Sequence, residues 1–255
     1  MEKEKNPIQV SERIFVLVEE LAECGPIGLV ELSSRLGRHK STVHRILNSL
    51  QLMGYVRQSE DGKYALSLKW MDISSKVINK FDIVATARPY LKKICEISGE
   101  TVHLVEMDGV DAIYIDKVES FSNSIRMVSK IGSRIPLFCS GVGKAILASK
   151  SDEEIKSIWE KSDVKAMTPN TITDFKDFMD TINKIRVDGY ALDNEENETG
   201  VRCIAACILS RDGKCKNAFS ISAPINRMTD EKIGYLAKYV IEMKNDISSE
   251  MGYKK

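Results

Sequence analysis

The sequence predicts an α+β protein in which an N-terminal winged helix-turn-helix precedes a larger domain of mixed strands and helices. Three amphipathic segments and a hairpin signal fall within the first 70 residues, in the order of a winged helix-turn-helix. Beyond residue 82, strand and helix patterns mix without the strict alternation of a parallel α/β sheet. A chain of 255 residues is long enough for two such domains.

Composition and charge limit the classes of protein to which the chain can belong. Hydrophobic residues make up 43% and charged residues 29%, which is typical of a globular protein with a packed core. Lys and Arg together number 37, as do Asp and Glu, so a nucleic-acid site would need local segregation of charge.

The sequence also argues against a membrane or secreted protein. No apolar run approaches the ~20 residues of a membrane span. Residues 1–5 are charged and no apolar stretch follows them, and six cysteines are too few for a disulfide scaffold. We therefore expect a cytoplasmic protein with reduced cysteines and no membrane partner.

Three helices are predicted between residues 10 and 53 from apolar positions at i, i+3, i+4 and i+7. The apolar stripes of the first and third helices are formed by Ile14, Leu17, Val18 and Leu21, and by Val43, Ile46, Leu47 and Leu50. The second helix covers residues 28–36. Gly25-Pro26 ends the first helix, and Gly37 and Gly54 end the other two, because glycine adopts the left-handed conformation of a helix C-cap easily.

A hairpin and a linker helix follow these three helices. Residues 55–57 and 63–66 flank Asp61-Gly62, which is a turn signal between two short strands. A helical pattern near residues 70–80 would connect this unit to the rest of the chain. We therefore place the winged helix-turn-helix domain at residues 1–69, the linker helix at 70–82 and the second domain at 83–255.

The second domain combines two predicted strand pairs with five helices. Strand pairs are expected over residues 101–118, with a turn at Asp108-Gly109, and over 202–209 with 215–222. Helices are expected from Ile83 onward, with Pro89 near the start or at a kink, and over 143–149, 151–161 and 173–187. Ser151 and Glu154 fit a capping box, and Thr229 can cap a last helix.

A basic stretch without acidic residues covers the third predicted helix, because residues 32–59 contain no Asp or Glu. The polar stripe of that helix offers an arginine, which suits guanine, and an asparagine, which suits adenine. Its N-terminus lies where phosphate would bind, and a lysine beside the hairpin turn would follow the backbone in the minor groove. The candidate DNA-binding residues are Arg38, Lys40, Ser41, Thr42, His44, Arg45, Asn48 and Lys63.

A solvated basic helix in a protein-interaction module would carry a similar charge. The three-helix order, the hairpin and the missing acidic residues together favour double-stranded DNA as the partner. We expect Arg45, with His44 or Asn48, to select the base sequence, and Lys40 to bind phosphate in any sequence.

Several motifs resemble those of a known family of transcription regulators. The recognition helix of the IclR family is similar to Lys40-Ser41-Thr42-Val43-His44-Arg45-Ile46-Leu47 followed by Gly54-Tyr55-Val56. Further family signatures resemble residues 99–104, 132–137, 143–148, 189–196, 200–205 and 220–222. Within the family, residues 124–127, 186–189, 193–196 and 247–253 are similar to the KdgR-type repressors of pectin and hexuronate breakdown.

The resemblance implies a homodimer or dimer of dimers that binds double-stranded operator DNA, with a GAF-like C-terminal domain that binds a small organic acid. The family includes repressors and activators, and a repressor is expected here. The KdgR-type subgroup responds to 2-keto-3-deoxygluconate, which makes this compound the leading effector, with another small carboxylic acid as the alternative. The family's effector positions correspond to Met127, Ile135, Gly141, Val142, Asp193, Cys203, Ser220 and Ser222.

The chemistry of these positions suits a small acid. Residues 140–143 lead into a helix whose N–H groups could hold a carboxylate. Ser220 and Ser222 share one face of a predicted strand, and Asp193 could accept hydrogen bonds from ligand hydroxyls. Val142 is bulkier than the alanine common in the family. The serines could also be ordinary strand residues, and the acidic run around Asp193 could be a solvated loop.

The sequence predicts no catalytic set, no cofactor and no metal site. Cys203, Cys207 and Cys215 lack a zinc-binding spacing and have no histidine nearby, so we expect core or pocket thiols. His103 lies in an alternating strand, where a structural, hydrogen-bonded role is expected. Two rivals stay open: an enzyme with a DNA-binding appendage, which would need a reactive Cys203 or His103, and an architectural DNA protein that binds no ligand.

Overall fold

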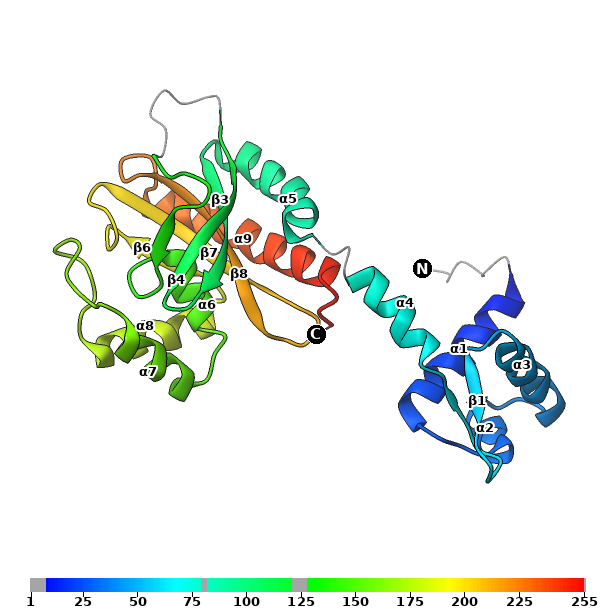
Figure 1. Cartoon of the computed structure of the whole chain (residues 1–255). Coiled ribbons are helices and arrows are strands. Elements are labelled where there is room, and N and C mark those ends of the chain that lie inside the picture. Colours follow the sequence, from blue (N-terminus) through cyan, green and yellow to red (C-terminus); the bar gives the residue numbers. More distant parts are fainter. Residues whose placement is uncertain (1–7, 79–81, 121–127, 255) are drawn as a thin grey trace. The chain divides into compact units, whose positions relative to one another are not determined.

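A computed structural model of the chain describes residues 8–78, 82–120 and 128–254 (Figure 1). These residues form two compact units, which divide between residues 81 and 82. The N-terminal unit has one hydrophobic core, and the C-terminal unit has two, one on each face of its sheet. Within the described ranges, no helix is both long and apolar enough to cross a membrane.

The N-terminal unit is a winged helix-turn-helix, as the sequence predicts. In chain order it consists of α1 (Gln9–Cys24), α2 (Leu29–Arg35), α3 (Lys40–Leu52), β1 (Val56–Gln58), β2 (Tyr64–Leu66) and α4 (Lys69–Ile78). Strands β1 and β2 form the wing and pair antiparallel, with Arg57 opposite Ala65. Gly37 follows α2 with a φ of +59°, a conformation that a side chain would strain.

The predicted apolar stripes of α1 and α3 meet in one core. Leu17, Val43 and Leu47 are fully buried there, whereas Ile14 and Ile46 are only partly buried at its edge. Burying a side chain of this size stabilises the fold by roughly 1.5–3 kcal/mol. The core therefore fixes which face of α3 points inward and which points to solvent.

The first turn of the linker helix α4 contacts the turn between α3 and β1. Trp70 Nε1 donates a hydrogen bond to the Tyr55 carbonyl at 3.0 Å, and the two rings are 5.0 Å apart. Lys69 Nζ donates to the Met53 carbonyl at 2.7 Å and lies over the Tyr55 ring. These contacts fix the start of α4 against the turn between α3 and β1.

The C-terminal unit is built on a six-stranded antiparallel sheet with the order β5-β4-β3-β8-β7-β6. Its strands are β3 (Thr101–Asp108), β4 (Asp111–Val118), β5 (Arg134–Pro136), β6 (Ala191–Asn194), β7 (Val201–Leu209) and β8 (Cys215–Pro224). The two predicted strand pairs, β3–β4 and β7–β8, are confirmed and lie at the centre of the sheet. The mixed α+β class is confirmed as well.

Helices cover both faces of this sheet (Figure 1). Residues of α5 (Ile83–Ser98) and α9 (Asp230–Glu250) pack on one face. Residues of α6 (Gly141–Leu147), α7 (Asp152–Lys161) and α8 (Phe175–Asp188) pack on the other. Because side chains alternate along a strand, each strand contributes alternate residues to each core.

Local signals start the helices where the sequence predicts. The capping box at α7 is present: Glu154 N–H donates to Ser151 Oγ at 3.3 Å, and Ser151 N–H donates to Glu154 Oε2 at 3.1 Å. Thr229 Oγ1 caps α9 by accepting from the Lys232 N–H. Pro89 lies inside α5.

Candidate DNA-binding surface and effector site

The outer face of α3 presents the predicted base-contacting residues to solvent. Ser41, His44, Arg45 and Asn48 are all exposed. Asn48 Nδ2 lies 3.5 Å from His44 Nδ1, so these two polar groups are neighbours on the helix surface. An exposed arginine and asparagine on one helix face can both contact base edges in a major groove.

The N-terminus of α3 has features of a phosphate-binding position. His39 occupies the N-cap and accepts no side-chain hydrogen bond there, so it does not satisfy the free N–H groups of the first turn. Arg38, Lys40 and Ser41 line an open groove beside this end. Free N–H groups and two cations together favour an anion.

Two predicted DNA-binding residues lie in different surroundings from those expected. Lys63, in the wing, forms an ion pair with Asp61 at 3.0 Å, so its charge is partly compensated. Thr42 is half-buried and lines a groove of about 270 Å³ between α1 and α3. Arg45 and Arg13 line the same groove. Arg13 was missed because the α1 sequence gives no sign that its polar face adjoins α3.

Three of the predicted effector residues form one row across the sheet. Asp193 on β6 lies opposite Cys203 on β7, and Cys203 lies opposite Ser222 on β8. Ser220 is two residues before Ser222, and their hydroxyl oxygens are 3.4 Å apart. Both serines and Asp193 are buried. The strand register therefore brings together residues that lie far apart in the sequence.

The start of α6 packs against this row. A Cβ atom on Gly141 would lie 3.4 Å from both Asp193 N and the Ala205 Cβ, so only a small residue allows this approach. Val142 and Ile135 are buried in the adjacent core, at the apolar side of the cluster. Met127, the remaining predicted lining residue, lies outside the described residues.

At residues 140–143, the predicted carboxylate-binding helix N-terminus, one N–H group already has a partner within the protein. Ser140 is the N-cap of α6, and its Oγ accepts a hydrogen bond from Gly143 N–H at 3.1 Å. The N–H group of Gly143 is therefore not available to a carboxylate. The small residues in the turn instead allow close packing, because a Cβ on Gly143 would lie 2.2 Å from the Leu137 carbonyl oxygen.

Asp193 is a buried carboxyl group, not part of a solvated acidic loop. Its Oδ1 accepts from the N–H of Glu196 at 2.8 Å and of Asn197 at 3.4 Å. Burial raises the pKa of Asp193 to about 6, against the lowering effect of those N–H groups and of Lys144. Within the described part of the chain, its Oδ2 accepts no hydrogen bond and is therefore available to a ligand.

His103 and Tyr114 add polar groups to the cluster that were not predicted as effector-binding. His103 Nδ1 lies 3.2 Å from Ser222 Oγ, and its Nε2 lies 2.6 Å from Ser129 Oγ. Both ring nitrogens thus have partners, as expected for a structural histidine. The Tyr114 ring is 5.0 Å from the His103 ring. The sequence could have indicated that these two side chains lie close together, because Tyr114 and His103 lie on neighbouring predicted strands.

The cysteine and the histidine of the cluster are uncharged at neutral pH. Burial raises the pKa of the Cys203 thiol far above its usual value, and the Asp193 carboxylate adds to this effect. Burial, with the nearby Lys117, lowers the pKa of His103 to about 3. At neutral pH the site therefore holds a neutral thiol and a neutral imidazole, which can donate and accept hydrogen bonds. Among the described residues, no group of three His, Cys, Asp or Glu could hold a metal ion.

Comparisons with known proteins agree with this architecture. Residues 11–60 match the IclR helix-turn-helix domain, and residues 75–249 match the C-terminal domain of bacterial transcriptional regulator IclR. The chain is 35% identical over 253 residues to the HTH-type transcriptional regulator KdgR of Escherichia coli, covering 98% of this chain and 96% of that protein. It is 34% identical over 249 residues to the acetate operon repressor of Salmonella typhimurium, covering 96% and 90%.

A solved structure leads to the same result. The crystal structure of Thermotoga maritima IclR aligns with a TM-score of 0.65 at 32% identity and covers 96% of this chain and 99% of that one. The residues that match these relatives and both domain families include the exposed face of α3 and the buried row at Asp193. The chain therefore belongs to the IclR family of bacterial, DNA-binding transcriptional regulators.

Proposed function

We propose that this protein represses genes of sugar-acid breakdown and is released from its operator by a small hydroxylated acid, with 2-keto-3-deoxygluconate as the leading candidate. In this proposal α3 enters the major groove, and the cluster formed by Asp193, Cys203, Ser220, Ser222, His103 and Tyr114 binds the acid. We call this group the effector cluster.

The main support for the proposal is that several buried polar groups lie together in the effector cluster. Buried hydroxyls and carboxylates are costly unless they are hydrogen-bonded. Asp193 has one oxygen with no hydrogen-bond donor among the described residues, and the Ser220–Ser222 contact is long at 3.4 Å. A ligand with several hydroxyls would supply donors and acceptors for both.

Tyr114 supports a hydroxylated ligand in particular. Burial raises the pKa of its phenol, and the Cys203 thiol and the Asp193 carboxylate add to this effect. Its hydroxyl makes no hydrogen bond to any residue in the described ranges. A ligand hydroxyl is a suitable partner for this half-buried phenol.

A different small carboxylic acid is the alternative effector. The acetate operon repressor of Salmonella is almost as similar to this chain as KdgR is, so overall identity does not separate the two ligand classes. Val142 leaves less room in the site than the alanine that is common at this position in the family, and this favours a shorter acid. The polar groups around Asp193 and Tyr114 favour the longer, hydroxylated one.

DNA binding is proposed to involve two copies of the chain. A dimer would place two α3 helices on half-sites separated by about 10 base pairs or a multiple of it, so the operator would be pseudo-palindromic. Arg45, with His44 and Asn48, would contact bases, and Arg38, Lys40 and Ser41 would bind phosphate. We retain Thr42 and Lys63 as weaker phosphate contacts and add Arg13.

The test is a titration of 2-keto-3-deoxygluconate into a complex of the full chain with operator DNA. A coupling of about 1–3 kcal/mol would weaken operator binding roughly 5–150-fold, because the acid must bind the free protein more tightly than the bound one. Acetate and pyruvate serve as comparison acids. Unchanged operator affinity with 2-keto-3-deoxygluconate, but weakened affinity with a shorter acid, would select the alternative effector.

A further inference from the structure

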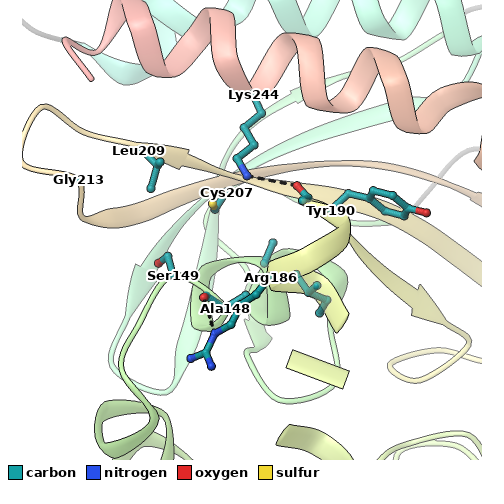
Figure 2. A pocket seen from close by; sticks show the side chains of 11 residues that line it. Ala148, Ser149, Arg186, Tyr190, Cys207, Leu209, Gly213 and Lys244 are labelled. Carbon is teal, nitrogen blue, oxygen red and sulfur yellow. Dashed lines mark hydrogen bonds between the residues drawn. The ribbon is translucent and has the colours of Figure 1, made fainter. Parts of the chain in front are cut away.

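A cavity of about 250 Å³ lies in the C-terminal unit where α6, α8 and α9 approach strand β7 (Figure 2). None of the effector cluster residues lines it. Its wall includes the thiol of Cys207 and the ammonium group of Lys244, with Ser149 below them. A nucleophilic group beside a cation in an open cavity has no part in the proposed DNA or effector binding.

Cys207 has a second cysteine as its neighbour. On the β7–β8 hairpin, Cys207 lies opposite Ala218, and Leu209 lies opposite Cys215. Cys207 and Cys215 both belong to the core on the α6 side, so their side chains leave the sheet from the same face. They are diagonal neighbours on adjacent strands. The Cys215 thiol donates a hydrogen bond to the Asn217 carbonyl at 3.2 Å, and the two thiols shift each other's pKa.

The hairpin is irregular at this place. Its register shifts between Ile208 and Leu209, so β8 accommodates one extra residue between the partners of these two positions. Such a bulge increases the local twist of the strands. Because both thiols lie on one face of the hairpin, the added twist can bring the two sulfurs closer together.

The two thiols differ in reactivity, and Lys244 adds to the difference. Its Nζ donates to the Gly189 carbonyl at 3.3 Å, and in the described part of the chain it has no carboxylate partner. The neighbouring Cys215 thiol lowers the pKa of Cys207, burial opposes this, and the Lys244 charge lowers the pKa further. The neighbouring Cys207 thiol and burial raise the pKa of Cys215. The thiolate is the nucleophilic form, so Cys207 is the attacking sulfur.

We propose that Cys207 and Cys215 form a redox-active thiol pair that a small, uncharged hydroperoxide oxidises to a disulfide. The Cys207 thiolate attacks one peroxide oxygen, the O–O bond breaks, and hydroxide leaves, which gives a sulfenic acid. The Cys215 sulfur attacks this sulfenic sulfur, the S–S bond forms, and a second hydroxide leaves. The two thiol protons convert both hydroxides to water. Two thiols and one hydrogen peroxide thus become one disulfide and two waters.

The disulfide would link the two strands that also carry Cys203 and Ser222. The oxidation site and the effector cluster therefore lie on the same hairpin, although their residues do not share a cavity. The remaining cysteines offer a matched control. Cys95 is buried on the opposite face of the sheet, and burial raises its pKa, so it should not react.

The experiment treats the reduced, full-length protein with hydrogen peroxide and maps thiols and disulfides by mass spectrometry of non-reduced peptides. We expect two of the six thiols to disappear, a peptide pair joined through Cys207 and Cys215, and full reversal by a reductant. Cys95→Ser should behave like the wild type. Cys207→Ser should form no crosslink, and Cys215→Ser should stop at a sulfenic acid on Cys207 that dimedone traps.

Lys244→Met tests the role of the charge without touching either cysteine. We expect it to slow the oxidation of Cys207 several-fold at pH 7 and to move the midpoint of the rate profile to higher pH. Retention of all six thiols by the folded wild type, or oxidation of Cys95 as fast as that of Cys207, would overturn the proposal. Because the wild type itself gives this result, the test does not depend on whether the variants fold.

Discussion

The ammonium group of Lys144 on α6 forms a buried ion pair with the carboxylate of Glu196, in the loop that follows β6. Their side chains are only 1% and 8% exposed. The N–H of Glu196 donates to the Asp193 carboxylate, so the ion pair fixes the loop that positions a central residue of the effector cluster. Glu196 Oε2 has no hydrogen-bond partner among the described residues. The Glu196 carboxylate therefore depends on Lys144 to compensate its charge.

Lys144→Met should be strongly destabilising. It leaves the buried Glu196 carboxylate without a counter-charge, which typically costs about 3–5 kcal/mol. Urea unfolding of the single variant measures this loss. The double variant with Glu196→Gln should recover part of it, because the uncompensated charge is then absent. A single variant as stable as the wild type would show that the ion pair contributes nothing to the fold.

Gly143→Ala should damage α6 for a steric reason. The added Cβ would meet the Leu137 backbone at 2.2 Å, and backbone cannot move aside as a flexible side chain does. We expect a loss of about 3 kcal/mol in the free energy of unfolding. Gly234→Ala is the matched control, because nothing lies within 4 Å of its Cβ position on helix α9. There, alanine should stabilise the protein by about 0.5–1 kcal/mol.

Local sequence patterns were sufficient to predict most of the fold. Caps, apolar stripes and Asp-Gly turns depend on neighbouring residues, so the winged helix-turn-helix, the central hairpins and the α7 capping box were all predicted. Strands β5 and β6 were missed because they have three and four residues and lie at the sheet edges, where burial leaves little periodicity. A short edge strand is stabilised by its partner, not by its own pattern.

The effector cluster was predictable only in part. The family resemblance identified Asp193, Cys203 and Ser222 as positions, but their row depends on strand register, which is a long-range property. The Lys144–Glu196 pair joins residues that are 52 positions apart, and no local pattern indicates it. Lys63 shows the opposite case, because its ion pair with Asp61 is local and could have been anticipated from the wing sequence.

Asp193→Asn should change how stability depends on pH. The pKa of Asp193 is raised from 3.8 to about 6, so the folded protein holds this proton more tightly than the unfolded chain. Its contribution is therefore favourable at low pH and is lost as pH rises from about 4 to 6, by on the order of 3 kcal/mol. The stability of the wild type relative to Asp193→Asn should fall across this range and stay constant above pH 7. Denaturant unfolding at several pH values measures the difference, and a constant difference would contradict the burial of an ionisable group there.

Tyr114→Phe should separate hydroxylated acids from simple ones. The change removes only the phenol oxygen, which has no hydrogen-bond partner in the described part of the chain and whose pKa is raised by burial, Cys203 and Asp193. If the oxygen binds a ligand hydroxyl, affinity for 2-keto-3-deoxygluconate should fall about 5–15-fold, corresponding to a net hydrogen bond of about 1–1.5 kcal/mol. Calorimetric titration measures this loss. Affinity for pyruvate and for operator DNA should be unchanged, and an equal loss for pyruvate would argue against a hydroxyl contact.

Arg45→Ala and Lys40→Ala should weaken DNA binding in different ways, because both side chains are exposed on α3 but at different places. Arg45 lies on the outer face beside His44, where a bidentate contact to guanine contributes about 1–3 kcal/mol of discrimination. Its loss should relax base preference at one position of each half-site. Lys40 lies in the first turn, so its loss should weaken binding to every sequence and lower the slope of log affinity against log salt by about 1. Binding to operator and random duplexes across a salt series distinguishes the two effects. Equal losses on both duplexes for Arg45→Ala would assign Arg45 to phosphate, because a base contact contributes only where its base is present.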